Sequence, residues 1–124
     1  MNKFELYEKF RSQFPDIAAQ ADNEYNQIWY DEKTLSPFIW FESVATVINT
    51  KMRLKTEASE LCKLFEFFRK EYLTGNDVNK KCIDVAVIEN LFWKVDSISA
   101  ETYWRHLPTV LQELYVEFHQ KEPY

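Results

Sequence analysis

V-N-K-K-C-I-D-V-A-V-I-E-N-L-F-W, residues Val78 to Trp93, is the stretch that decides the fold. Plotted at about 100° per residue, its apolar side chains fall on two faces of one helix. The first face carries Val78, Cys82, Val85, Phe92 and Trp93, and the second carries Ile83, Val87 and Leu91. A helix that is apolar on most of its circumference is typical of the interior of a small domain. We therefore expect this helix to be packed on several sides.

Glu89 is the exception on that helix, because it falls in the centre of the first apolar face. An ionised carboxylate buried without a partner is costly, so Glu89 must be paired, hydrogen-bonded, protonated or turned towards a cleft. If the next turn centres near Asp96, Glu89 lies level with Tyr103 and close to Arg105. We expect Glu89, Tyr103 and Arg105 to form a buried polar group. A cleft that reaches Glu89 is the alternative.

The composition favours helices joined by short loops. The chain has 124 residues, of which 46% are hydrophobic and 17% aromatic, with a single Gly and four Pro. So few turn-forming residues argue against an all-β chain. We predict one all-α domain spanning residues 1–124, with six or seven helices. The pattern does not decide between an antiparallel bundle and a HEAT-like helical array, although helices three to five should pack as antiparallel neighbours.

Capping residues predict where several of these helices begin and end. Ser36 followed by Pro37 is typical of an N-cap with proline in the first turn, and Thr56 is the predicted N-cap of the next helix. Gly75 stands where a left-handed residue commonly ends a helix. Asn76, or the aspartate after it, is then expected to cap the central helix.

Charge and hydropathy narrow the classes of partner. The net charge of −5 would repel a phosphate backbone, so we expect no nucleic-acid partner. No apolar run approaches the roughly 20 residues of a membrane span, and the start of the chain does not resemble a signal peptide. We therefore expect a cytoplasmic protein without a membrane partner. Cys62 and Cys82 fit that reducing compartment as unpaired core residues.

No pattern of catalytic or metal-binding residues stands out. The sequence lacks a G-x-S-x-G elbow and a glycine-rich loop. His106 and His119 lie thirteen positions apart, and no C-x-x-C pair accompanies them. We expect no metal, no cofactor and no catalytic residue, and the sequence does not favour an enzyme.

The acidic stretch from Asp16 to Glu32 is the most suggestive surface feature. It holds five acidic residues and no Lys or Arg. Acidic residues steer a basic partner, while Trp and Tyr provide anchors that lose their water on binding. The predicted partner-binding residues are Asp22, Glu24, Trp29, Tyr30, Asp31 and Glu32. The alternative is an ordinary solvated helix whose aromatic residues lie in the core.

Two segments carry a resemblance to a known kind of protein. V-I-E-N-L (residues 87–91) and F-E-F-F-R-K-E-Y (residues 65–72) resemble small uncharacterised bacterial all-helical domains. Some of those domains are encoded beside polymorphic toxins and are suspected to be immunity proteins. The resemblance implies a bacterial cytoplasmic binding protein and transfers no catalytic or ligand residue.

The sequence thus leads to two functional hypotheses. The first is a protein-binding module, most concretely an immunity-type inhibitor that masks a basic toxin domain. The second is a small-molecule-binding or catalytic domain in which Glu89 lines a cleft between helices. The oligomeric state is open in both hypotheses.

Overall fold

The computed structural model describes residues 4–28 and 36–124, and these residues form seven α-helices and no strand. The predicted all-α domain is confirmed. The α-helices are α1 (Phe4–Gln13), α2 (Pro15–Ile28), α3 (Pro37–Arg53), α4 (Ala58–Thr74), α5 (Asp77–Lys81), α6 (Ser97–Trp104) and α7 (Thr109–His119). After α5 the chain continues as a π-helix, η1 (Cys82–Val87), and a 3-10 turn, η2 (Ile88–Asn90).

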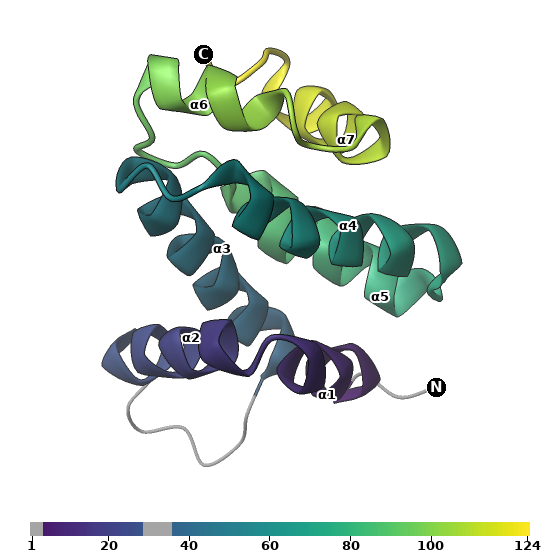
Figure 1. Cartoon of the computed structure of the whole chain (residues 1–124). Helices are drawn as coiled ribbons and strands as arrows, with labels where there is room; N and C mark the ends of the chain where they lie inside the picture. The colour runs from purple at the N-terminus through teal and green to yellow at the C-terminus, as the bar shows by residue number, and fades with distance from the viewer. Residues whose placement is uncertain (1–3, 29–35) are drawn as a thin grey trace.

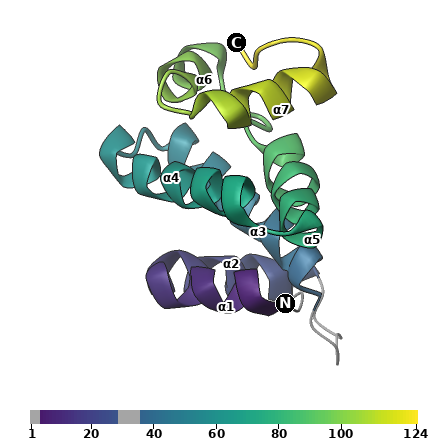
Figure 2. The same ribbon diagram turned by 90° about the vertical axis from the view of Figure 1, so that its right-hand side faces the viewer.

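The helices lie in three layers, with α3 running across them (Figure 1). One outer layer is α1 followed by α2, the middle layer contains α4 and α5, and the other outer layer is α6 with α7. Turning the molecule by 90° shows the same three layers (Figure 2). Because α3 is steeply inclined to α4 in Figure 1, the expectation that helices three to five are simple antiparallel neighbours is wrong.

An aromatic cluster around Phe10 joins α1, α3 and α4. Phe10 is completely buried, and its ring lies 5.7 Å from that of Trp40 and 5.6 Å from that of Phe41, both on α3. On its other side the rings of Phe67 and Phe68 of α4 lie 5.4 and 5.7 Å away. Three of these pairs are edge-on and the pair with Phe68 is stacked, and such ring pairs add to the free energy gained by burying apolar area. The aromatic centre of the core therefore lies outside the stretch from Val78 to Trp93.

The helix-capping predictions are partly confirmed. Ser36 accepts a hydrogen bond from the backbone N–H of Ile39 (3.3 Å), with Pro37 as the first helical residue, and the Asn76 side chain caps α5. Thr56 is not the N-cap of α4, because the helix begins two residues later. Instead, the Thr56 carbonyl accepts a hydrogen bond from the Tyr103 hydroxyl of α6.

Gly75 is required at the end of α4 for a different reason from the predicted one. Its φ is −81°, which any residue can adopt, so the expected left-handed conformation is wrong. A Cβ atom at this position would lie 2.5 Å from the Glu71 carbonyl oxygen and 3.0 Å from Cβ of Asn79. The chain thus needs glycine because α5 returns very close to the last turn of α4.

The segment from Val78 to Trp93 is not the uniform α-helix that the spacing of 100° per residue assumed. In the π-helical segment η1 each hydrogen bond spans five residues instead of four, so successive side chains rotate by a smaller angle. Ile83, Val87 and Leu91 are buried as expected, whereas Val78, which precedes η1, and Trp93, in the turn after η2, are exposed. The smaller rotation per residue in η1 also moves Glu89 away from the buried face on which regular α-helical spacing placed it.

A charged network ties the first three helices together. The Arg11 guanidinium donates two hydrogen bonds of 2.8 Å to the two carboxylate oxygens of Asp22, and the buried Trp40 indole donates a third at 2.9 Å. The Arg11 guanidinium, above all, holds the pKa of Asp22 below its ordinary value. Two parallel hydrogen bonds also fix the angle between α1 and α2.

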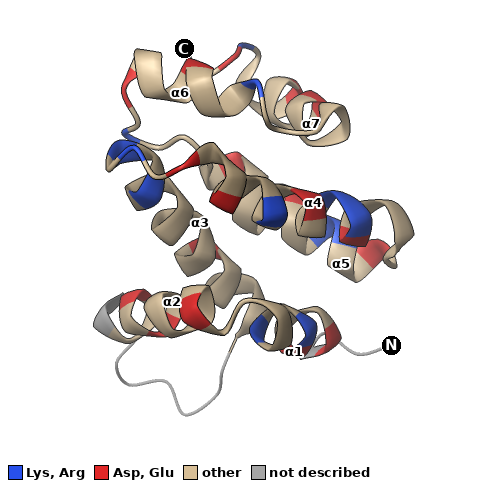
Figure 3. Cartoon of the chain, viewed as in Figure 1, with Lys and Arg blue, Asp and Glu red and all other residues tan. Residues whose placement is uncertain are grey.

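The charges on the surface are unevenly distributed. Lys51 and Arg53 in the last turn of α3 and Lys55 just beyond it place positive charge at this end of the molecule, where Figure 3 shows Lys and Arg gathered. Cations at the C-terminus of a helix are favourable because they face the negative end of the helix dipole. The surface of this acidic chain therefore includes a region of opposite sign.

Gly75→Ala is expected to lower the free energy of unfolding by about 1–3 kcal/mol, because the new methyl group overlaps backbone that cannot move freely. Urea denaturation followed by circular dichroism measures the loss. Thr74→Ser, which keeps the neighbouring hydroxyl, is the control and should leave the midpoint nearly unchanged. A fully stable Gly75→Ala variant would show that the α4–α5 turn relaxes without cost.

Asp22→Asn is expected to destabilise the fold by about 1–2 kcal/mol at pH 7, because the partly exposed pair with Arg11 loses its charge. The folded-state pKa of Asp22 is lowered, so its contribution to stability is present above the unfolded value of about 3.9 and disappears as the pH falls below it. The difference between wild type and variant should therefore shrink towards pH 3. Glu8→Gln, an exposed change on α1, should show no such convergence.

Candidate functional site

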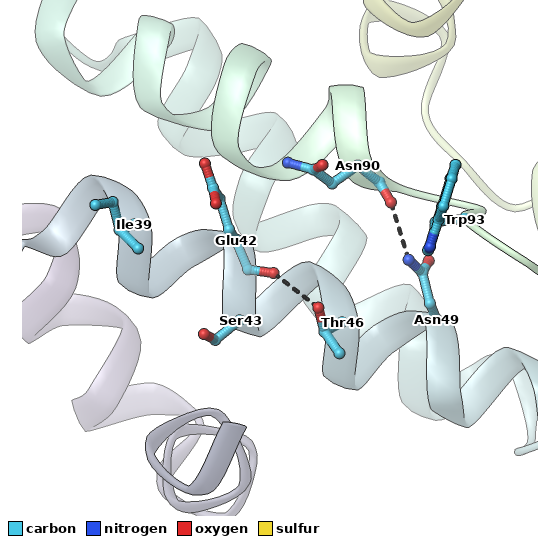
Figure 4. Close-up of a pocket in the computed structure, with 7 residues that line it drawn as sticks. All are labelled: Ile39, Glu42, Ser43, Thr46, Asn49, Asn90 and Trp93. Carbon is cyan, nitrogen blue, oxygen red and sulfur yellow. Dashed lines mark hydrogen bonds between the residues drawn. The ribbon is translucent and has the colours of Figure 1, made fainter. Parts of the chain in front are cut away.

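A hollow of about 380 Å³ lies between α3 and the segment that follows η1. Figure 4 shows the side chains that line it. They are Ile39, Glu42, Ser43, Thr46, Asn49, Asn90 and Trp93. The α3 residues repeat at helical spacing and so present one continuous face, which the η2 end closes from the other side. Polar side chains and the apolar surface of Ile39 and Trp93 are combined in this lining.

Asn49 fixes the far wall of this hollow. Its side chain is buried, and its Nδ2 donates to the Asn90 carbonyl (2.9 Å) while its Oδ1 accepts from the Phe92 N–H (2.7 Å). Buried backbone groups left without partners would be costly, and helix η2 ends here without supplying partners of its own. One side chain on α3 therefore satisfies both a donor and an acceptor of the chain that leaves η2.

The backbone around Trp93 is held in an unusual conformation that turns its side chain outward. Phe92 and Lys94 have φ values of 69° and 58°, in the left-handed region that non-glycine residues seldom adopt. Phe92 is buried against Trp104 and Tyr115, whereas Trp93 is 68% exposed. Strained residues of this kind persist only where the surrounding structure holds them, and they gather at functional sites.

Glu42 is the carboxylate of the hollow. It lies on α3 beside the η1 segment (Figure 4), and partial burial raises its pKa above the ordinary value. Among the described residues no cation forms an ion pair with it. Burial raises the pKa of the Cys82 thiol to about 12, and the charge of Glu42 is a smaller cause of the same shift.

Three more carboxylates, Asp84, Glu89 and Glu117, gather where η1, η2 and α7 meet; we call them the acidic cluster. Burial raises the pKa of Asp84, and the charge of Glu117 raises it further. Burial likewise raises the pKa of Glu89, with a second contribution from Asp84 and an opposing one from His119. In the part of the chain that the structure describes, none of the three has an ion pair. The native fold therefore holds three carboxylates here that no ion pair among the described residues neutralises directly.

The buried polar group predicted from the sequence does not form. Tyr103 is buried but donates to Thr56, while Arg105 is exposed and pairs with Glu101 at 3.0 Å. Glu89 is only partly buried, and the contact at its position is made by its carbonyl, which accepts a hydrogen bond from His119 Nε2 (3.1 Å). The predicted position of Glu89 was wrong because it assumed α-helical geometry throughout a segment that is partly π-helical.

The buried carboxylate that the sequence analysis missed is Glu71. It is 5% exposed, and its two oxygens lie 3.2 and 3.3 Å from the Lys9 ammonium group of α1. Glu71 follows Phe67 and Phe68 at helical spacing, so its place on the inner face of α4 could have been found. Its partner lies 62 residues earlier, and no local pattern indicates that pairing.

The predicted partner-binding residues are dispersed. Asp22 is held by Arg11 and Trp40, so its carboxylate is engaged within the chain. Glu24 is partly buried and lines a separate hollow between α2 and α3 with Thr50 and Leu54. The remaining four lie outside the described residues; they are Trp29, Tyr30, Asp31 and Glu32.

The other expectations concern cysteines, metals and membranes. Cys62 and Cys82 are both free. Within residues 4–28 and 36–124 there is no group of three or more His, Cys, Asp or Glu placed to hold a metal ion. None of the helices in those ranges is long and apolar enough to cross a bilayer.

Comparison with known families places the chain in one of them. Residues 7–121 match the family described as a domain of unknown function, DUF7674. The chain belongs to the DUF7674 family. No curated protein and no solved structure matches it. The resemblance to an uncharacterised family is thereby confirmed, and the description of the DUF7674 family names neither an organism nor a partner.

In this DUF7674 domain, Asn49→Ala is expected to lower the free energy of unfolding by about 2–4 kcal/mol, because it leaves two backbone groups without their partner. Thermal or urea unfolding measures the loss, and the emission spectrum of Trp93 should report a changed environment. Asn90→Ala is the matched control, since its exposed side chain only donates to carbonyls of its own helix. Equal effects of the two changes would contradict a special role of Asn49.

Proposed function

We propose that this DUF7674 protein is a protein-binding module whose acidic cluster receives a basic surface of another protein. The uncompensated charge of Asp84, Glu89 and Glu117 is the observation that carries the proposal. A neighbouring carboxylate that raises the pKa of Asp84 or of Glu89 reduces the stability of the free protein. A cationic partner would remove that repulsion on binding, so the same three groups would favour association.

The hollow beside the cluster extends this surface. Asn90, which directly follows Glu89, lines the hollow together with Glu42 and Trp93. Trp is one of the residue types that contribute most to protein interfaces, because its ring is large and loses little conformational freedom. A Lys or Arg side chain that enters between Glu42 and the Trp93 ring would find a carboxylate and an aromatic face.

The specific form that we propose is immunity: the protein masks a basic toxin domain and so blocks its action. The sequence resemblance to domains encoded beside toxins supports this form, together with the acidity of the chain. The acidic stretch from Asp16 to Glu32 stays part of the proposal as a second contribution to long-range attraction. Because Arg11 neutralises Asp22, the contribution of this stretch comes from its other carboxylates.

A triple variant, Asp84→Asn, Glu89→Gln and Glu117→Gln, tests the proposal. We expect it to unfold at a slightly higher denaturant concentration than wild type, because repulsion is removed, and to capture its basic partner at least tenfold less well. Both proteins are immobilised, exposed to an extract of the native cell, and the retained proteins are identified by mass spectrometry. If the retained protein is toxic when produced alone, coproduction of wild type but not of the variant should restore growth.

The matched control neutralises three other exposed carboxylates by Glu8→Gln, Glu60→Gln and Asp77→Asn. It has the same net charge as the triple variant, so a general effect of charge would affect both equally. Capture by the control should equal that of wild type. Retention of the same proteins by the triple variant would contradict the acidic cluster as the binding surface.

A further inference from the structure

A second surface lies at the end of the molecule where α3 stops and α6 starts (Figure 1). Leu54, Trp93 and Ile98 are 75%, 68% and 78% exposed, the highest values among the large apolar side chains that the structure describes. They belong to the C-cap of α3, the loop after η2 and the first turn of α6. Such side chains scattered singly are ordinary, but a group of them marks an interaction surface.

Two contacts show that these three segments lie side by side. The Arg53 guanidinium donates to the Trp93 carbonyl (3.0 Å), and the Lys55 ammonium donates to the Ser99 hydroxyl (3.1 Å). The Arg53 contact joins the end of α3 to the loop after η2, and the Lys55 contact joins the end of α3 to α6. We call this surface, made of Leu54, Trp93 and Ile98 with the cations around them, the basic apolar end.

The cations are Arg53, Lys55 and Lys94, and all three are exposed. The Lys94 ammonium lies 5.9 Å from the centre of the Trp93 ring. Asp96 lies among these cations, with its carboxylate capping α6 through the N–H of Ser99 (3.0 Å), and the exposed Glu57 follows Lys55 by two residues. On a chain of net charge −5, the basic apolar end is thus a local reversal of sign.

The backbone of this end is shaped to hold its side chains outward. Lys55, Phe92 and Lys94 account for three of the four non-glycine residues with positive φ in the described chain. Each costs free energy unless its surroundings compensate. The Asn49 hydrogen bonds and the Arg53 contact provide that support on either side of Trp93. The exposure of Trp93 is therefore a built feature rather than the result of a loose loop.

We propose that the basic apolar end docks on the surface of a lipid bilayer that contains anionic headgroups. Lys and Arg would pair with lipid phosphates, while Trp93, Leu54 and Ile98 would enter the boundary between headgroups and acyl chains. Trp and cationic residues are the types that this boundary favours. Three protruding side chains from three segments would need a matching set of pockets on a protein, whereas a bilayer accepts them in any arrangement.

Glu42, the acidic residue of the hollow, shares the hollow with Trp93 but lies far from the cations at the end of α3. Glu42 precedes Arg53 by eleven residues on the same helix, which is roughly 16 Å at the rise of an α-helix. That separation exceeds the distance of about 8 Å over which physiological salt screens exposed charges. Docking through the basic apolar end would therefore keep Glu42 farther from the lipid headgroups than the cations at the end of α3.

Flotation with vesicles tests this proposal on the full chain. Wild type should float with vesicles of phosphatidylcholine and phosphatidylserine at physiological salt, and should stay behind with vesicles of phosphatidylcholine alone. Further salt should release it, since each cation contributes roughly a fivefold factor near an anionic surface. Tryptophan emission should shift to shorter wavelength on binding. Absence of flotation with the anionic vesicles at physiological salt would overturn the proposal and favour a protein partner for this end.

Variants separate the basic apolar end from the acidic cluster. Leu54→Ser with Ile98→Ser should lower flotation at least tenfold, whereas Leu73→Ser with Phe118→Ser, exposed apolar residues elsewhere, should not. Circular dichroism and unfolding midpoints confirm that both double variants are folded. The triple variant of the acidic cluster should float as wild type does. Equal losses in the two double variants would show general stickiness and contradict the proposed surface.

Discussion

The two hydrogen bonds of Asn49 are the constraint on which the candidate site depends. A chain that leaves a helix must find partners for its last polar groups, and here the nearest ones come from α3. Because Asn49 hydrogen-bonds both the Asn90 carbonyl and the Phe92 N–H, it determines where η2 ends and in which direction the chain then turns. Phe92 is directed into the core against Trp104 and Tyr115, and Trp93 is directed out. The docking of α6 and the outline of the hollow follow from that turn.

The charge pattern separates stability from function. Arg11 with Asp22 and Lys9 with Glu71 compensate carboxylates where helices pack; the first pair joins consecutive helices, and the second joins helices distant in sequence. The acidic cluster has no such compensation among the described residues, although cations are present on neighbouring helices. The carboxylates that join helices are thus paired, whereas those of the acidic cluster are not, and this contrast is what motivates the proposed binding surface.

Local chemistry let the sequence predict much of the fold. Ser36 with Pro37 marked the start of α3, Asn76 marked the start of α5, and the scarcity of glycine indicated helices throughout. What failed depended on departures from ideal geometry. Glu89 was misplaced because a helical wheel cannot register a π-turn, and Gly75 was misinterpreted because the tight α4–α5 turn brings Glu71 and Asn79 against it without a left-handed residue. The candidate site was missed for the same reason, since Asn49 and Asn90 lie 41 residues apart.

The π-helical segment has a consequence for how relatives of this protein should be aligned. A π-turn holds one residue more than an α-turn, so a family member that lacks one residue between positions 82 and 87 could keep the helix but would rotate everything after it. Its counterpart of Glu89 would then turn inward, and its counterparts of Asn90 and Phe92 would no longer meet the α3 asparagine. A single gap at this place in an alignment would therefore divide the family into members that possess the hollow and members that do not.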